Sequence, residues 1–358
     1  MQIYKCKNCD APLFWNAKTN SLHCEFCGET YQTTDFEDVT VNEEHVPQEI
    51  IADQEPVQNE DTVSYVCQNC QGTVVATKTT MATTCPYCGE AISITSKSTG
   101  DFRPSMIIPF ALTKQQAQKI YSDQLKKSKL IPQIFLDNNT IEKIQGVYVP
   151  FYLHTLTDRA NHTFRGEKVS HSRRGDDRIT THHIYHLHID ADYNFEKVPT
   201  DASKKLSNKL MDAIEPFVYG QLQDYNPAFM AGFLAEQKDD DPQLLKDRVL
   251  SRCKESAEAM AKDRFSGYSS IVTVDRAHDI QEYNTDYVML PVWVLNVKHE
   301  QTKYQFLING QTGKFAGELP LDKKKLLGYA AAFFGVVEGI GILLSPIIGP
   351  LVTIMLGG

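Results

Sequence analysis

The stretch GVYVPFYLHTL, residues 146–156, is a run of β-branched and aromatic residues that is interrupted by one proline. A second stretch, DYVMLPVWVLNV at residues 286–297, repeats this composition around its own proline. Each is followed by a polar turn and another strand-like run, which is typical of hairpins in an antiparallel or mixed sheet. Because proline cannot donate to a strand ladder, we expect Pro150 and Pro291 at a bulge or a sheet edge. The repetition predicts two related half-units of one domain, which we place at residues 100–321.

Helices are predicted between these strands, so the class expected for residues 100–321 is α+β. Thr113 and Gln116 have the spacing of a capping box, and apolar residues follow at helical intervals. Another helix should begin near Pro242 and end before Gly267. Its apolar stripe includes the ninth cysteine, Cys253, which we interpret as a core residue rather than a reactive thiol.

The other eight cysteines form C-x-x-C pairs, a spacing that favours metal binding in a reducing compartment over disulfides. The segments CKNCDAPLFWNAKTNSLHCEFCGE (6–29) and CQNCQGTVVATKTTMATTCPYCGE (67–90) are repeats, with fourteen residues between the pairs of each. Two such pairs on adjacent turns supply the four thiolates of a tetrahedral zinc ribbon. We therefore predict small β ribbons at residues 1–34 and 62–99, each with one structural Zn²⁺. The predicted ligands are Cys6, Cys9, Cys24 and Cys27 in the first ribbon, and Cys67, Cys70, Cys85 and Cys88 in the second.

The net charge of −9 is concentrated between the two ribbons. Residues 35–61 contain ten carboxylates and no Lys or Arg, which leaves 36 basic and 35 acidic residues in the rest of the chain. We interpret this segment as an acidic, flexible linker. The ribbons have no marked basic excess, and four thiolates leave each metal site negative. Charge therefore argues against nucleic-acid binding.

The C-terminal segment, residues 322–358, is predicted to anchor the chain in a membrane. From Leu326 onward it contains a single charged residue, and SPIIGP at 345–350 should break the helix after one crossing, followed by a re-entrant segment or a tight hairpin. Three lysines precede the span, and the positive-inside rule places them and everything N-terminal to them on the cytoplasmic side. These residues are Lys323, Lys324 and Lys325. The expected localisation is the cell membrane, with the bulk of the chain in the cytoplasm.

The single charge of this span is Glu338, which lies within a small-xxx-small pattern formed by Gly335 and Gly339. An ionised carboxylate within a bilayer needs a partner or must reach an interface. Two interpretations follow. Glu338 faces another transmembrane helix, from a second copy or a different protein, or it snorkels to the membrane surface.

The densest ionisable stretch of the middle domain is RRGDDRITTHHIYHLHID, residues 173–190. If residues 180–192 form a strand, alternation places His182, His186, His188 and Asp190 on one face. Such a face can bind a metal or transfer protons, but a half-exposed strand shows the same alternation, and we favour a solvated face. The sequence has no phosphate-binding loop, no G-x-S-x-G and no H-E-x-x-H, so no reaction is indicated.

Several phrases resemble one bacterial family. Besides the ribbon pairs, they are FEKVPTDASKKLSNKLMDAIEPF (195–217), MAGFLAE (230–236), the strands GVYVPFYL and LPVWVLNV, and NGQTGKFAGELP (309–320). The chain resembles bacterial proteins with TFIIB-type zinc ribbons, the YdjG-like group. The resemblance implies a membrane-associated adaptor of Gram-positive bacteria that acts near phage-shock-type envelope-stress proteins.

Together, the residues and this resemblance predict a non-enzymatic, membrane-tethered adaptor that recruits protein partners and forms homo-oligomers through the tail. Two alternatives remain: a nucleic-acid-binding zinc-ribbon regulator, and an enzyme whose site lies in the α+β domain.

Overall fold

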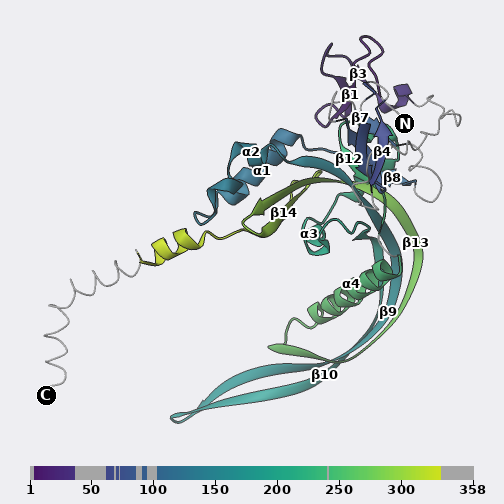
Figure 1. The fold of residues 1–358 in the computed structure, drawn as a ribbon. Coiled ribbons are helices and arrows are strands. Elements are labelled where there is room, and N and C mark those ends of the chain that lie inside the picture. The colour runs from purple at the N-terminus through teal and green to yellow at the C-terminus, as the bar shows by residue number, and fades with distance from the viewer. Residues whose placement is uncertain are drawn as a thin grey trace, which may run out of the picture.

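Three very long strands dominate the computed structural model, which describes residues 4–36, 62–67, 70–71, 73–85, 91–94, 103–239 and 242–331. They are β9 (Gln145–Arg174), β10 (Asp177–Asp201) and β13 (Ser270–His299). β9 lies in the middle and pairs antiparallel with β10 on one side and β13 on the other. The distal parts of the three strands form a curved arm that projects from the rest of the molecule (Figure 1).

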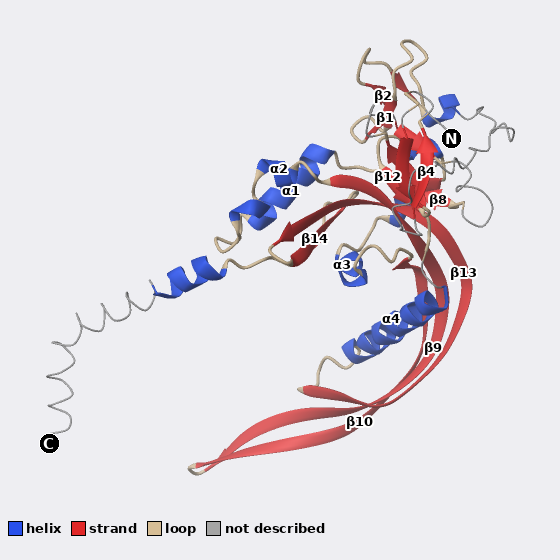
Figure 2. Ribbon diagram, viewed as in Figure 1, coloured by secondary structure: helices blue, strands red, loops and turns tan. Residues whose placement is uncertain are grey.

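The long strands belong to a ten-stranded mixed sheet. Its main path runs β11-β8-β13-β9-β12-β6-β7, while β10 pairs with β9, β14 with β13, and β15 with β14. The short strands are β6 (Thr80–Thr84), β7 (Ala91–Ser93), β8 (Met106–Ile107), β11 (Gln223–Asp224), β12 (Leu234–Glu236), β14 (Thr302–Asn309) and β15 (Phe315–Gly317). Sheet therefore makes up more of the described structure than the predicted α+β class implies (Figure 2).

The sheet has internal pseudo-twofold symmetry about the β9–β13 pair. β12 runs parallel to β9 with Leu234 opposite Val147, and β8 runs parallel to β13 with Met106 opposite Val288. Val147 and Val288 each lie three residues before the proline of their strand. Each half consists of a short strand, a helix, a long strand and a return strand. The short strand of each half pairs with the long strand of the other half.

Pro150 and Pro291 lie within these central strands rather than at a bulge or edge as predicted. β10 ends opposite the residue after Pro150, and β12 ends opposite the residue two positions before it. Likewise, β14 ends opposite Val292, the residue after Pro291, and β8 ends opposite Met289, two positions before it. Each proline thus lies at a gap between two neighbouring strands. No backbone N–H is needed there for a ladder hydrogen bond.

The helices are α1 (Lys114–Leu125), α2 (Asn138–Ile141), α3 (Asn208–Ala213) and α4 (Pro242–Asp263). The capping box before α1 is confirmed, because Thr113 Oγ1 accepts from the Gln116 N–H and Gln116 Oε1 accepts from the Thr113 N–H. α4 begins at Pro242, as predicted, and lies along the inner side of the curved arm (Figure 1). Cys253 is buried on α4, and burial raises the pKa of its thiol to about 11. This agrees with a core role.

The two faces of the sheet near its centre carry separate hydrophobic cores. Tyr148 of β9 packs in the same cluster as Tyr121 of α1, whereas the next residue, Val149, packs in the cluster that contains Ile214 after α3. The alternation of side chains along a strand explains why adjacent residues join different cores. A single strand thus positions α1 and α3 on opposite faces.

Both ribbons are attached to this sheet. The first consists of β1 (Leu13–Asn16), β2 (Ser21–Cys24), β3 (Thr30–Tyr31) and the 3₁₀ turn η1 (Thr33–Phe36). The second contains the hairpin β4 (Thr62–Val66) and β5 (Thr73–Thr77), followed by β6, which pairs with β12 through Ala82 and Ala235. Most of the predicted acidic linker, residues 37–61, lies outside the described residues.

The prediction of a C-terminal transmembrane segment is corrected by the structure. Across the described ranges, no helix has both the length and the apolar character needed to cross a bilayer. The structure therefore contradicts the transmembrane helix, the tail anchor and the membrane localisation. Residues 332–358, which include Gly335, Glu338 and Gly339, lie outside the described residues.

The three lysines expected to flank a membrane span lie at the start of a helix that begins at residue 323. Asp322 Oδ1 accepts hydrogen bonds from the backbone N–H groups of Lys324 and Lys325, as an N-cap does. Lys325 Nζ donates to the carbonyl oxygen of Ile131 at 2.7 Å, while Lys323 is exposed. Lys325 therefore ties the helix to the loop that follows α1.

Candidate metal centres

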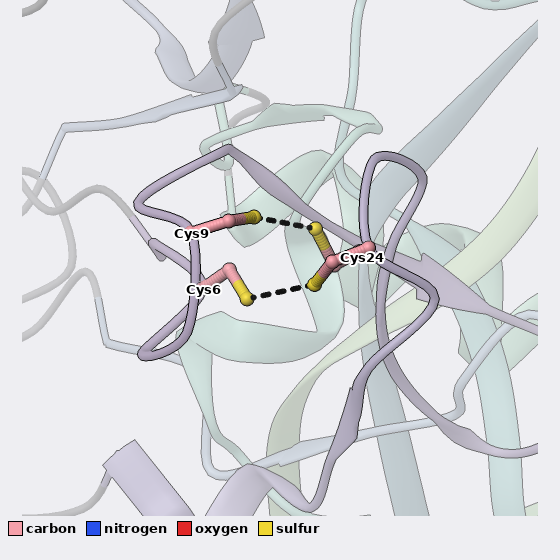
Figure 3. A group of neighbouring side chains, drawn as sticks. Cys6, Cys9 and Cys24 are labelled. Atoms are coloured by element: carbon pink, nitrogen blue, oxygen red, sulfur yellow. Dashed lines mark hydrogen bonds between the residues drawn. The ribbon is translucent and has the colours of Figure 1, made fainter.

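The first cysteine cluster brings together all four predicted ligands, Cys6, Cys9, Cys24 and Cys27. The Sγ atoms of Cys6 and Cys27 are 3.5 Å apart. Those of Cys9 and Cys24 are also 3.5 Å apart (Figure 3). A tetrahedral Zn²⁺ with Zn–S bonds of about 2.3 Å places its sulfur ligands roughly 3.8 Å apart. The four sulfurs thus lie close to the spacing that one tetrahedral ion requires.

The turns that carry the cysteines share one backbone geometry. In each of the three described turns, the residue after the second cysteine donates its N–H to the carbonyl oxygen of the first cysteine, at 2.8–2.9 Å. These residues, Asp10, Gly28 and Gln71, all have positive φ, at 59°, 79° and 60°. The left-handed conformation is ordinary for glycine and costs other residues about 1–2 kcal/mol. The recurrence shows that the two ribbons repeat in backbone geometry as well as in sequence.

Two of the four sulfurs are buried and two are exposed, with Cys6 and Cys24 forming the buried pair. The Tyr31 hydroxyl lies 3.3 Å from Cys6 Sγ. A hydrogen bond from this hydroxyl, and further hydrogen bonds from the backbone N–H groups of Asn8 and Cys9, lower the pKa of Cys6 to about 6. Backbone N–H groups of Cys27 and Phe26 lower the pKa of Cys24. Metals bind the thiolate, so these donors favour the ligand form.

The second cluster contains Cys67, Cys70 and Cys85 among the described residues. The Sγ atoms of Cys70 and Cys85 are 3.7 Å apart, which again suits a shared ion. The fourth predicted ligand, Cys88, lies outside the described residues. Both clusters can therefore hold a metal ion.

The first ribbon is fixed to the sheet by Trp15, which is 6% exposed. Its indole N–H donates to the Phe110 carbonyl oxygen at 3.4 Å, and its backbone N–H donates to the Ala231 carbonyl oxygen at 3.0 Å. Its ring meets Phe229 edge-on, with centroids 4.8 Å apart. The ribbon core thus continues into the domain core, and the Trp15 ring is not free to stack on a base.

A cleft of about 520 Å³ lies beside this contact. Its wall includes Phe14, His23 and Glu25 from the first ribbon and Lys114, Gln145 and Trp293 from the domain. Its shape depends on the ribbon, because His23 and Glu25 flank the metal ligand Cys24. The cleft therefore lies beside the first cysteine cluster.

The predicted histidine face lies on β10, where His182, His186, His188 and Asp190 are all exposed. His188 contacts Asp190 and Thr163, each at 3.2 Å, and His182 contacts Glu167. Over the part of the chain that the structure describes, only the cysteines bring three or more candidate ligand atoms together. The preferred interpretation, a solvated strand face, agrees with these contacts.

Sequence reasoning missed a row of buried polar side chains beneath α4. His278 Nδ1 lies 2.7 Å from Asp158 Oδ2, and His154 Nδ1 lies 2.8 Å from Glu282 Oε1. His162 is 0% exposed, and neither ring nitrogen has a hydrogen-bond partner among the described residues. The sequence signal for this row was the spacing of His154, Asp158 and His162. They are separated by even numbers of residues on β9, so their side chains share the strand face that α4 covers.

The opposite face of the arm is exposed and acidic. In one row across the three strands, Arg159 of β9 lies opposite Asp192 of β10 and Asp279 of β13. The next two rows on this face add Asp190 and Asp275. All five side chains are exposed, and the Arg159 Nε donates to Asp192 at 3.0 Å. We call this surface, defined by Arg159, Asp190, Asp192, Asp275 and Asp279, the acidic outer face.

Comparisons with known proteins found a relative over almost the whole chain. The uncharacterised protein YdjG of Bacillus subtilis (strain 168) is 31% identical over 355 residues, which cover 99% of this chain and 98% of that protein. No family model matches the chain, so the TFIIB-type assignment of the ribbons stays a prediction. No solved structure matches it.

Proposed function

The chain belongs to the family of YdjG, and we propose that it is a protein-binding scaffold. In this scaffold, two zinc ions fold the ribbons onto the sheet. The arm of the sheet presents its acidic outer face to a partner protein. The observation that carries the proposal is the acidic outer face itself. It lies on a projecting arm, and the opposite side of the same strands is packed against α4.

Zinc is the ion that the donor set favours. Clusters of thiolates select soft or borderline ions, and a complete set of four cysteines leaves no open coordination position, which is typical of structural zinc. The sulfur separations of 3.5–3.7 Å support the same ion in both clusters. Each ion would crosslink two turns in a ribbon too small to have a large core of its own.

The acidic outer face favours a partner with a basic protein surface. Four carboxylates surround one arginine, so the face has a negative potential that speeds the approach of basic partners and repels polyanions. Three paired strands hold these side chains on one surface, so little ordering is needed when a partner binds. The same charges, with the burial of Trp15, support protein binding over nucleic-acid binding.

A photo-crosslinking experiment in cells tests the proposal. A photoreactive amino acid replaces Ala277, which is exposed beside the carboxylates, or Lys119, an exposed control position on α1. We expect a discrete adduct with a partner protein from position 277 and none from position 119. The quadruple variant combines Asp190→Asn, Asp192→Asn, Asp275→Asn and Asp279→Asn. In this variant the yield of the adduct should fall about tenfold, because the carboxylates that attract a basic partner are removed.

Metal content and the far-ultraviolet circular dichroism spectrum of the quadruple variant serve as folding controls. Equal adducts from positions 119 and 277, or an adduct that the four substitutions leave unchanged, would contradict partner binding at the acidic outer face.

A further inference from the structure

β10 has one unpaired edge along its whole length. It pairs with β9 from Asp177 to Asp201, and no described strand pairs with its other side. An exposed strand edge carries a row of unpaired backbone N–H and C=O groups, which is a template for another strand. The arm therefore presents an edge far longer than the usual five or six residues of a strand.

The second long edge of the arm, on β13, is protected in a way that the edge of β10 is not. The register of β13 against β9 shifts at Val274 and again at Tyr283, and such bulges prevent edge-to-edge pairing. β10 keeps one continuous register from Asp177 to Phe195 and has one shift, between Phe195 and Val198, so Glu196 is the first residue beyond the continuous stretch. In that stretch, DRITTHHIYHLHIDADYNF, there is no Lys, Pro or Gly, the residues that usually blunt an edge.

The charges of β10 are divided between its two halves. The first half carries Asp177 and Arg178, whose formal charges cancel, together with His182, whereas the second half carries Asp190, Asp192 and Glu196, and all of these side chains are exposed. A second copy that pairs in the parallel direction sets like charges against each other. A second copy that pairs in the antiparallel direction sets the acidic half of each strand against the half of the other that carries Arg178 and His182.

We propose that two copies of this chain form a dimer by antiparallel pairing of their β10 edges, centred on Leu187. In this register, Arg178 of each copy lies opposite Glu196 of the other, and His182 lies opposite Asp192. On the other face of the strand, Tyr185 lies opposite Ile189 of the second copy.

This register also gives apolar partners to two of the exposed apolar residues of the edge, whereas Ile184, 53% exposed, lies opposite Asp190. Ile179 is 41% exposed and lies opposite Phe195 of the second copy, while Tyr185, also 41% exposed, gains an apolar neighbour. A shift of two residues in either direction separates Arg178 from Glu196. In this register, even-numbered residues of one copy pair with even-numbered residues of the other, and side chains that lie opposite each other point to the same face. The acidic outer faces of both copies therefore lie on the same side of the joined sheet.

The dimer joins the two arms into one six-stranded sheet, with a twofold axis through Leu187. Such an isologous interface uses the same surface twice, so every pair of contacts occurs twice. The proposal concerns the edge of β10 and does not depend on partner binding at the acidic outer face.

Charge reversal with rescue tests both the dimer and its register, using sedimentation equilibrium of the full-length, metal-loaded protein. We expect the wild-type chain to be a dimer at micromolar concentration. Arg178→Glu alone and Glu196→Arg alone should each weaken the dimer at least tenfold, because each creates two like-charge contacts per dimer. The double variant R178E/E196R should recover the wild-type dissociation constant within about threefold, since both contacts are restored in reverse.

Arg103→Glu is the matched control, because Arg103 is exposed and lies before β8, outside the arm, and it should leave dimerisation unchanged. Thermal unfolding and metal content establish that each variant is folded. A wild-type monomer throughout the micromolar range would overturn the proposal. So would single variants that dimerise normally, or a double variant that stays as weak as the single variants.

Discussion

Pro150 and Pro291 occupy equivalent positions, since the carbonyl oxygen of each accepts a hydrogen bond from the residue that follows the return strand of its own half. The donors are the N–H of Ala202, at 2.9 Å, and the N–H of Gly310, at 2.8 Å. The residues just before these donors, Asp201 and Asn309, are therefore equivalent too, and both are buried. One half uses a carboxylate where the other uses a neutral amide.

This equivalence predicts how the buried charge of Asp201 can be removed. Arg248 NH1 donates to Asp201 Oδ1 at 2.6 Å, whereas burial raises the pKa of Asp201. Arg248→Leu leaves an unpaired buried carboxylate and should cost about 3 kcal/mol of unfolding free energy. Adding Asp201→Asn, which copies the other half, should recover most of this loss in urea titrations. A double variant no more stable than Arg248→Leu alone would show that the two positions are not equivalent in energy.

Metal analysis checks the two cysteine clusters. The purified chain should contain two zinc ions, and Cys24→Ser should contain one, because the first cluster loses a buried ligand. Its melting temperature should fall, since the ribbon core is continuous with the domain core. Cys253→Ala is the control, because Cys253 lies on α4 away from both clusters, and it should retain two ions. Full zinc content in Cys24→Ser would rule out this ligand set.

The docking of the first ribbon predicts a large effect at Trp15. Trp15→Ala removes the edge-on contact with Phe229 and the hydrogen bond to Phe110, and it should cost about 3–5 kcal/mol in chemical unfolding. Phe26→Ala is the matched aromatic control, because Phe26 is 79% exposed and its loss should change stability by less than about 0.5 kcal/mol. Hydrogen exchange at residues 227–230 should also accelerate in Trp15→Ala. Comparable stability of the two variants would mean that the ribbon is not held by this contact.

His162 predicts the direction of a pH effect. Burial, and then the neighbouring His278, lower the pKa of His162, so the folded state keeps the ring neutral while the unfolded state takes up a proton near pH 6.5. The folded state therefore loses stability as the pH falls below about 6.5, by at most about 1.4 kcal/mol per pH unit from this residue. His162→Phe should remove that part of the pH dependence, as measured by thermal unfolding at pH 7.5 and 5.5. His171→Phe is the control, since His171 is exposed and the substitution should leave the slope unchanged.

Local features were predictable because they depend on residues near one another in the sequence. The cysteine spacing predicted the ligand sets, Thr113 and Gln116 predicted the start of α1, and the apolar stripe of α4 placed Cys253 in the core. The apolar composition of residues 326–358 predicted a membrane span. Composition alone does not establish a helix of sufficient length, and the described residues contain no such helix.

By itself, the sequence determined the ribbon motifs, the repeated proline-centred strands and the helix starts, since spacing and periodicity act over a few residues. Only the tertiary structure decided that Trp15 closes the first ribbon onto the domain, that the short strand of each half pairs with the long strand of the other, and that His162 is buried under α4. These features come from contacts between residues tens to hundreds of positions apart. Which distant residues meet is decided by the packing of the whole chain, because many different pairings satisfy the same local pattern.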